Sequence, residues 1–482
     1  MKARRLALCL IFLGTLPIVS SAETFADRKI GFKPVHYGLD LTLDYENHHL
    51  EGRCRLTLVH TTGQPEASVP LTLFRLLNVT SVRDGRGRAL EFRQRVLALE
   101  DWDVIQVNFV EVDLASPLGP GEKEDLVIDY SGSIVGYAAE GMLYVKDHVD
   151  KAFTILRTDG LAYPQIGVPS DKANRAAGLP EFDYDLKVTV PGPELAVNAG
   201  RLLERSTKDG RTIFHYVSAK PSWRIDVTVA DYRQRDDAAG NARVFCLAGD
   251  EESGGAILEA LAKCRGLFTT LFGPLPGDTP FSIIEVPEGY GSQADSACIL
   301  LTRDAFKDKS RFIDLYHEIS HLWNVKALDP QPPRFESEGL ATFLQYYVQV
   351  KLEGKTDALD RAEARILDRV RAELAKDRIA AESPMIDYGR VDKTDLSYTK
   401  GMLFFALLSR LMGEAELLKA VAGFQRHYAA SGATARQFLD WMAKSTPVPL
   451  NRVFDEWITG TGSTKMMLEG LTFDQILKKY RD

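Results

Sequence analysis

The chain has 482 residues, of which 45% are hydrophobic and 26% charged, and its formal net charge is −8. This length suits two or three domains, and the composition excludes disordered and fibrous proteins. The acidic balance argues against nucleic acid as a partner, because binding to a phosphate backbone needs a basic surface.

The N-terminus has the three parts of a secretory signal peptide. Residues 2–5 carry basic side chains, residues 6–19 are apolar, and residues 20–22 form a small-residue cleavage site. We therefore expect residues 1–22 to be removed and the protein to be secreted or periplasmic. The apolar stretch is short for a bilayer span and no later one is long enough, so no integral membrane segment is expected after signal removal.

The next part of the chain, residues 35–233, alternates apolar and polar residues with period two. Tyr37, Leu39 and Leu41 follow this pattern, and turn clusters at residues 84–87 and 119–121 separate such runs. The pattern predicts an antiparallel β-sandwich or saddle-shaped sheet, forming an N-terminal domain over residues 23–235. A polar, turn-rich stretch at residues 235–241 is the expected domain boundary.

Beyond this stretch the pattern changes to mixed strands and helices. Strands are expected at 243–247, 280–286 and, as an edge strand after a glycine-rich turn, 297–301; helices are expected at 254–272, 310–325, 337–352, 358–376 and 400–411. This order predicts an α+β domain over residues 236–482 with a mixed sheet. The 358–376 helix reads as a surface helix whose charged residues pair within the helix around an apolar stripe.

Four cysteines follow the predicted signal peptide: Cys54, Cys246, Cys264 and Cys298. An oxidising compartment permits disulfides, and none of the spacings fits a metal knuckle. A Cys246–Cys264 bridge and buried free thiols both stay open at this point.

The motif that carries chemistry is His317-Glu318-Ile319-Ser320-His321 on the expected 310–325 helix. Residues four apart share a helix face, so both imidazoles can point at one metal ion. Glu318, beside the first histidine, can reach a water molecule at that ion. The motif therefore predicts a catalytic zinc site with His317 and His321 as ligands and Glu318 as general base, with one Zn²⁺ per chain.

A catalytic zinc ion needs a third protein ligand and an open fourth position. The segment 334–341 offers two carboxylates, Glu336 and Glu338. Side chains two apart on a helix point about 200° apart, so only one of them can face the metal. We expect that residue to be Glu338.

The runs HEISHLWNV (317–325) and EGLATF (338–343) resemble the aminopeptidase N and leukotriene hydrolase family of gluzincin metallopeptidases. The resemblance spans most of the chain and implies a thermolysin-like catalytic domain in which Glu338 is the third zinc ligand. The chain has two residues fewer between His321 and Glu338 than the family usually has. A weaker likeness is to the glycyl aminopeptidases, whose downstream spacing is not seen.

Downstream, Tyr398-Thr399-Lys400-Gly401 is similar to a Tyr-x-Lys-Gly motif of this family. The resemblance implies that the Tyr398 phenol donates a hydrogen bond to the oxyanion formed when the carbonyl is attacked. Taken alone, Tyr398 would be read as a packed core tyrosine. Glu318 would take a proton from the attacking water and deliver it to the leaving amine.

Aminopeptidases also need carboxylates that hold the free α-ammonium of the substrate. The family supplies one from a glycine-containing loop, and the resemblance places Gly291 in that loop and Asp295 at the carboxylate position. A glycine loop with a solvated Asp295 is the alternative. In residues 155–159, the candidate region for the family's second carboxylate that holds the substrate amine, the sequence contains no Glu. The chain ends about where the family's catalytic domain ends. We therefore expect an open cleft unless oligomerisation covers it.

Together these features predict an exported zinc metallopeptidase that acts on peptides, with aminopeptidase activity favoured. One alternative is an endopeptidase or other amide hydrolase that uses an open cleft. Another is a non-catalytic exported binding protein on the same fold.

Overall fold

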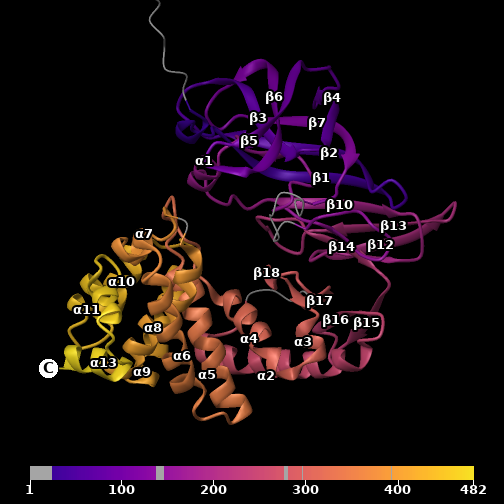
Figure 1. The fold of residues 1–482 in the computed structure, drawn as a ribbon. Coiled ribbons are helices and arrows are strands. Elements are labelled where there is room, and N and C mark those ends of the chain that lie inside the picture. The colour runs from indigo at the N-terminus through magenta and orange to yellow at the C-terminus, as the bar shows by residue number, and fades with distance from the viewer. Residues whose placement is uncertain (1–23, 137–145, 276–280, 296, 392, 482) are drawn as a thin grey trace, which may run out of the picture.

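A computed structural model describes residues 24–136, 146–275, 281–295, 297–391 and 393–481. The predicted signal peptide, residues 1–22, lies outside the described residues. Figure 1 shows a β-rich N-terminal half and a largely helical C-terminal half. Among the described residues, no helix is both long and apolar enough to cross a membrane.

A seven-stranded sheet, in the order β12-β13-β10-β1-β2-β7-β4, forms the centre of the N-terminal half. Its strands are β1 (Phe32–Asp44), β2 (His49–His60), β4 (Leu77–Asp84), β7 (Lys123–Ser133), β10 (Asp183–Val190), β12 (Arg201–Lys208) and β13 (Arg211–Val217). Tyr37, Leu39 and Leu41 of β1 are buried and Asp40 is exposed, as the period-two pattern predicts. Strands β1 and β10 run parallel, and the other pairs are antiparallel.

Two smaller sheets complete this half: β5-β6-β3-β9 and β11-β14-β8. Their strands are β3 (Glu66–Phe74), β5 (Phe92–Leu99), β6 (Trp102–Leu118), β8 (Thr154–Leu156), β9 (Gln165–Ile166), β11 (Leu195–Val197) and β14 (Val227–Ala230). Leu71 of β3 and Val110 of β6 share one core with Leu56 of the seven-stranded sheet. The β5-β6-β3-β9 sheet therefore packs face to face with the seven-stranded sheet. Ile155 of β8 instead packs with Ile284 of the next sheet, which joins the two halves.

The C-terminal half begins with a mixed sheet in the order β15-β16-β17-β19-β18. Its strands are β15 (Tyr232–Asp236), β16 (Ala242–Leu247), β17 (Phe281–Val286), β18 (Gln293–Asp295) and β19 (Cys298–Thr302). The three inner strands are parallel and the two outer ones pair antiparallel. The predicted mixed sheet is therefore present.

Two details of this sheet differ from the sequence analysis. The polar stretch expected as the boundary supplies the end of β15 and the turn to β16, so the predicted limit at residue 235 falls inside a strand of the second sheet. The strand expected at the edge, β19, pairs on both sides and all five of its residues are buried. The edge is β18, formed by residues assigned to the glycine-rich turn, because Gln293, Ala294 and Asp295 pair with Leu300, Ile299 and Cys298 of β19.

The helices are α1 (Asp171–Ala176), α2 (Glu251–Phe272), α3 (Asp304–Lys307), α4 (Phe312–Ser320), α5 (Leu340–Glu353), α6 (Ala358–Leu374), α7 (Arg378–Glu382), α8 (Thr394–Met412), α9 (Glu414–Tyr428), α10 (Ala435–Lys444), α11 (Asn451–Trp457), α12 (Gly462–Leu468) and α13 (Phe473–Arg481). The helix expected at 310–325 is shorter, because α4 ends at Ser320 and tightens into a 3₁₀ turn, η4 (His321–Trp323). The helix expected from residue 337 begins with a π-helical turn, η5 (Phe335–Gly339). Such widened turns occur mostly at functional sites.

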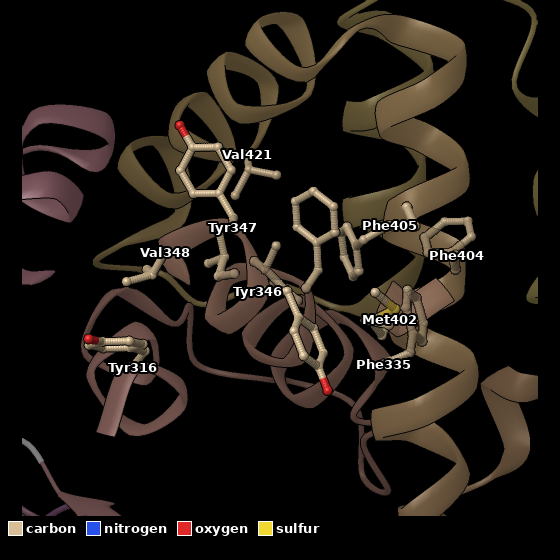
Figure 2. Close-up of a cluster of buried hydrophobic side chains, with 14 of the residues drawn as sticks. Tyr316, Phe335, Tyr346, Tyr347, Val348, Met402, Phe404, Phe405 and Val421 are labelled. Atoms are coloured by element: carbon tan, nitrogen blue, oxygen red, sulfur yellow. The ribbon is translucent and has the colours of Figure 1, made fainter. Parts of the chain in front are cut away.

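The core of the helical half is aromatic and holds η5 against α8. Figure 2 shows Phe335 beside Met402 and Phe404 in this core. Next to them the two backbones touch at glycine, because a Cβ on Gly401 would lie 2.8 Å from the Cα of Gly339. The absence of both side chains therefore brings η5 within reach of Tyr398 on α8.

The cysteines resolve one alternative that the sequence left open. Cys54, Cys246, Cys264 and Cys298 are all buried and all free thiols in the structure. A disulfide between Cys246 and Cys264 is therefore not formed.

Candidate metal centre and active site

The two histidines of the HExxH motif project from α4 and the turn that follows it. Leu315 and Ile319 are fully buried and fix one face of α4 on the core. His317 and His321 lie on another face with rings nearly perpendicular, and their Nε2 atoms are 3.2 Å apart. The i,i+4 spacing thus brings both nitrogens to one point, as predicted.

Glu338 reaches the same point from η5. Its Oε2 lies 3.2 Å from Nε2 of His317 and 3.2 Å from Nε2 of His321. The three donor atoms therefore form a triangle whose sides are all 3.2 Å. Ligands about 2.05 Å from a tetrahedral zinc ion lie about 3.3 Å from one another, so this triangle fits one face of a zinc coordination tetrahedron.

The outer nitrogens of both histidines have partners that orient the rings. Nδ1 of His317 lies 3.0 Å from Oε1 of Gln345, and Nδ1 of His321 lies 2.8 Å from the side-chain amide of Asn324. At His317 the Gln345 oxygen is an acceptor, which fixes the proton on Nδ1 and leaves the Nε2 lone pair for a metal. At His321 the neighbouring Asn324 atom is the amide nitrogen, Nδ2. The sequence analysis did not identify Gln345, although it follows Glu338 by seven residues and therefore lies two turns further along the same helix face.

Arg334 is a second contributor that the sequence analysis missed. It has a left-handed backbone conformation, with φ of 64°, where the chain turns into η5. Its guanidinium contacts Oε1 of Glu338 and lies 3.5 Å from the Tyr398 hydroxyl. Burial alone would raise the pKa of Glu338, but the contacts of its carboxylate with the imidazoles of His317 and His321 and the charge of Arg334 hold that pKa well below its usual value. Glu338 is therefore ionised, and its oxygen can bind a metal ion.

The other carboxylate of this segment, Glu336, points elsewhere. It lines a small separate cavity together with Gln425 and Phe438. Burial raises the pKa of Glu336 to about 7. The structure thus separates Glu336 from Glu338, as the angle between side chains two apart requires.

Glu318 lies beside the triangle, half-buried in the wall of the cleft described below. Burial raises the pKa of Glu318 to about 7, although the charge of His317 and a hydrogen bond from the backbone N–H of Ala294 both oppose this shift. A carboxylate with a pKa near neutrality can both take up and release a proton at working pH. Because Ala294 belongs to β18, the edge strand also positions this group.

Tyr398 faces the site from α8. Its ring stacks on that of His317 with centroids 5.5 Å apart and an angle of 9° between the planes. Burial and the nearby Glu338 carboxylate raise the pKa of Tyr398 above its usual value. The phenol therefore stays protonated at neutral pH and can donate a hydrogen bond.

A cleft of about 1080 Å³ opens over these groups. It runs from the loop containing Gly291, past His317, Glu318 and Tyr398, to helix α6. Gly291 thus lies in the cleft wall, as the predicted substrate contact requires.

The other predicted substrate residue, Asp295, does not point into this cleft. Its carboxylate accepts from the Ser222 hydroxyl at 3.2 and 3.3 Å, at the junction with the β-rich half. Its neighbour Gln293 instead donates to Asp159 at 3.1 Å and accepts from Arg224 at 2.8 Å. Asp159 lies in the 155–159 stretch, in which the sequence contains no Glu.

Comparison with known proteins agrees with the donor set. Residues 295–457, which contain the triangle, Glu318 and Tyr398, match the peptidase family M1 domain. This stretch of the chain is similar to an M1 peptidase domain. The predicted resemblance to the aminopeptidase N family is confirmed by this match.

Relatives in sequence are distant aminopeptidases. Aminopeptidase 2, mitochondrial, from Saccharomyces cerevisiae is 21% identical over 280 residues, covering 53% of this chain and 29% of that protein. Aminopeptidase M1-B from Oryza sativa subsp. japonica is 23% identical over 312 residues, covering 59% of this chain and 35% of that protein. The chain spans about a third of the length of these relatives.

Solved structures share both halves of the fold. An M1 zinc metallopeptidase variant from Deinococcus radiodurans bound to a Tyr-Ser-Ala substrate has a TM-score of 0.64 at 17% identity, covering 89% of this chain and 94% of that chain. A two-domain M1 zinc metallopeptidase variant bound to L-tryptophan gives 0.60 at 17% identity, covering 91% and 94%. The predicted β-domain followed by a catalytic domain is confirmed, and zinc is the cofactor that the M1 domain and its donor triangle indicate.

Proposed function

We propose that this protein is a zinc-dependent hydrolase of peptide bonds that removes N-terminal residues from peptides. The observation that carries the proposal is the triangle of His317, His321 and Glu338 donor atoms, with Glu318 beside it and Tyr398 stacked on it. Each group has a distinct task in amide hydrolysis.

When bound by His317, His321 and Glu338, zinc supplies a Lewis acid that makes water a nucleophile near neutral pH. Glu318 accepts a proton from the attacking water, because its carboxyl lines the cleft and has a pKa of about 7. The same group then delivers the proton to the leaving amine. Tyr398 donates its hydroxyl hydrogen to the carbonyl oxygen as negative charge develops there.

The free amine of the substrate is assigned to the β18 end of the cleft. Gly291 lines the cleft there, and the carboxylates of Asp159 and Asp295 lie against Gln293 and Ser222 at the same edge strand. Asp159 accepts from Gln293 and from Arg224, each at 3.1 Å, and we propose it as the alternative to Asp295 for holding the substrate amine. Asp159→Asn and Asp295→Asn are compared directly, and the substitution that weakens the preference for a free N-terminus more identifies the group that holds the amine.

Aminopeptidase and endopeptidase activity are separated by blocking the substrate amine. We expect a peptide with a free N-terminus to be cleaved at its first bond and the N-acetylated peptide to be cleaved at least tenfold more slowly, about the cost of one unpaired buried charge contact. Equal cleavage of both peptides would favour an endopeptidase, for which the open cleft is the supporting observation.

A non-catalytic binding protein is tested with Glu318→Gln. This substitution keeps the shape of the side chain and all three zinc ligands, so zinc content stays at the parent level. Turnover is expected to be lost, because the variant has no base to take the proton. Parent protein that is loaded with zinc and cleaves no peptide would favour the binding protein instead.

The predicted signal peptide supports export as part of this proposal. We propose that the mature protein is secreted or periplasmic and starts at Glu23. Mass spectrometry of the exported protein is expected to find Glu23 as its first residue. Full-length protein that begins at Met1 and stays in the cytoplasm would contradict the assignment.

A further inference from the structure

Helix α6 presents three arginines to the active-site cleft. Arg361, Arg365 and Arg369 follow one another at intervals of four residues, so they share one helix face, and all three line the cleft. The opposite face is held in the core by Leu367, Val370 and Leu374. What the sequence pattern describes as a solvated surface face is therefore one wall of the cavity that also contains Glu318.

This wall carries more positive than negative charge. Arg311 and Lys355 also line the cleft, so five cationic side chains face it, of which Lys355 is paired with Glu353 at 2.7 Å. The carboxylates in the lining, apart from Glu318, are Asp304 and Asp314, and Asp314 is paired with Arg311 at 2.7 Å. The net charge of the whole chain is −8, so the positive wall runs against the overall composition.

Arg365 is the member of the wall whose charge is held in place without being neutralised. Its guanidinium donates to the Tyr346 hydroxyl at 2.6 Å and lies 5.8 Å from the centroid of that ring. Tyr346 itself is buried. Within the described part of the chain, Arg365 forms no ion pair. A fixed, unpaired guanidinium in a cleft is a ready partner for a carboxylate.

The two flanking arginines differ from Arg365. Arg361 pairs with Asp357 at 3.2 Å and Arg369 pairs with Glu373 at 2.8 Å, each within α6. These exposed pairs are weak and can exchange for a ligand carboxylate at small cost. They therefore extend the positive surface on both sides of Arg365 along the helix.

We propose that this arginine wall binds a carboxylate of the peptide on the C-terminal side of the cleaved bond. The inference rests on the proposed function, because the free amine is assigned to the β18 end and the chain beyond the cleaved bond then extends toward α6. The carboxylate is supplied either by the C-terminus of a short peptide or by an acidic side chain. The protein thus prefers short free-acid peptides or peptides that are acidic after the cleaved bond.

Two peptide pairs distinguish these sources. The first pair has one neutral sequence of four residues, ending in a free carboxylate or in an amide. The second pair is amidated and carries either two Glu or two Gln residues after the cleaved bond. We expect the charged member of at least one pair to have a kcat/KM about three- to tenfold higher, mainly through a lower KM, since each exposed ion pair contributes a factor of up to about five.

The variants test whether the arginines cause this preference. Arg365→Gln is expected to reduce the charged-to-neutral ratio about threefold, and the triple replacement of Arg361, Arg365 and Arg369 by Gln is expected to bring it close to one. Arg365→Lys keeps the charge and retains most of the ratio. The matched control is Arg378→Gln, since Arg378 is an exposed helical arginine paired with Glu382 four residues on, as Arg369 is with Glu373, and lies outside the cleft lining.

A second measurement needs no variant. Raising the ionic strength from about 0.02 to about 0.3 M shortens the range of electrostatic attraction severalfold, so the preference of the parent enzyme should shrink while neutral peptides are cleaved as before. The inference is overturned if the parent shows no charge preference, or if Arg365→Gln and the triple variant keep the parent's ratio. Failure of the proposed function is a different result, in which neutral peptides with a free amine are not cleaved at all.

Discussion

Replacing Gly401 by alanine tests how the two halves of the site are held together. Gly401 on α8 lies against Gly339 at the end of η5, and this contact places Tyr398 and Glu338 on facing elements. A Cβ at position 401 would lie 2.8 Å from the Cα of Gly339, whereas ordinary contact begins at 3.4 Å. The two elements would therefore have to separate by about 0.6 Å, the difference between these distances.

The size of this displacement decides the expected effect. Metal–ligand distances tolerate deviations of about 0.2 Å, so a shift of three times that size in Glu338 breaks the triangle of donor atoms. We expect zinc affinity to fall about 10- to 100-fold, as when an outer partner of a ligand is lost. Overpacking costs about 1–3 kcal/mol, of which the better helix propensity of alanine recovers up to about 1 kcal/mol.

The assay is a chelator competition that gives the zinc dissociation constant, with the unfolding temperature measured alongside. Gly266→Ala is the matched control, because Gly266 is an exposed helical glycine on α2 and a Cβ there meets nothing within 4 Å. The control is expected to raise stability by about 0.5–1 kcal/mol and to leave zinc affinity unchanged. Parent-like zinc affinity in Gly401→Ala would refute the argument that this contact positions Glu338.

Three further substitutions probe other parts of the site and its support. Gln345→Leu removes the acceptor at Nδ1 of His317 and should weaken zinc binding about 10- to 100-fold in the same chelator assay, with unchanged affinity as the contrary result. Tyr398→Phe should lower kcat about 100-fold or more with little change in KM, and a parent-like kcat would remove Tyr398 from the mechanism. Burial lowers the pKa of Lys400 from 10.5 to about 7, so the folded state binds fewer protons than the unfolded chain between these pH values. The burial of Lys400 therefore destabilises the protein fully below about pH 7 and progressively less toward pH 10.5. Lys400→Met should raise the unfolding free energy, measured by urea titration, about 3 kcal/mol more at pH 7 than at pH 10. An equal gain at both pH values would contradict the lowered pKa.

The parts of the site that follow from local spacing were predictable. His317 and His321 converge because an α-helix places residues four apart on one face, and the choice between Glu336 and Glu338 follows from the same geometry. The β-rich half was also predictable, since β1 keeps a strict alternation of buried and exposed residues. In these cases the physical cause lies within a few residues of the sequence.

The features that were missed depend on distant partners. The direction of the Asp295 side chain is set by Ser222, 73 residues earlier in the chain, and β18 is too short for a period to be seen. Arg334 reaches Glu338 from a left-handed backbone conformation, which an arginine in the sequence does not predict.

Helix α6 also shows a feature that the sequence pattern could not predict. Its apolar stripe was predicted, and Ile366 and Val370 are buried accordingly. Periodicity gives the angle between two faces of a helix but not what lies opposite the outer one. Only tertiary packing turns the face of Arg365 toward the cleft instead of toward open solvent.

The most direct test of the central claim is the zinc content of purified, folded protein measured by elemental analysis after dialysis. The triangle of donor atoms predicts one zinc ion per chain, and its loss in His321→Ala with the fold intact by circular dichroism. Parent protein that is folded yet retains no stoichiometric zinc, or His321→Ala protein that retains it fully, would contradict the account.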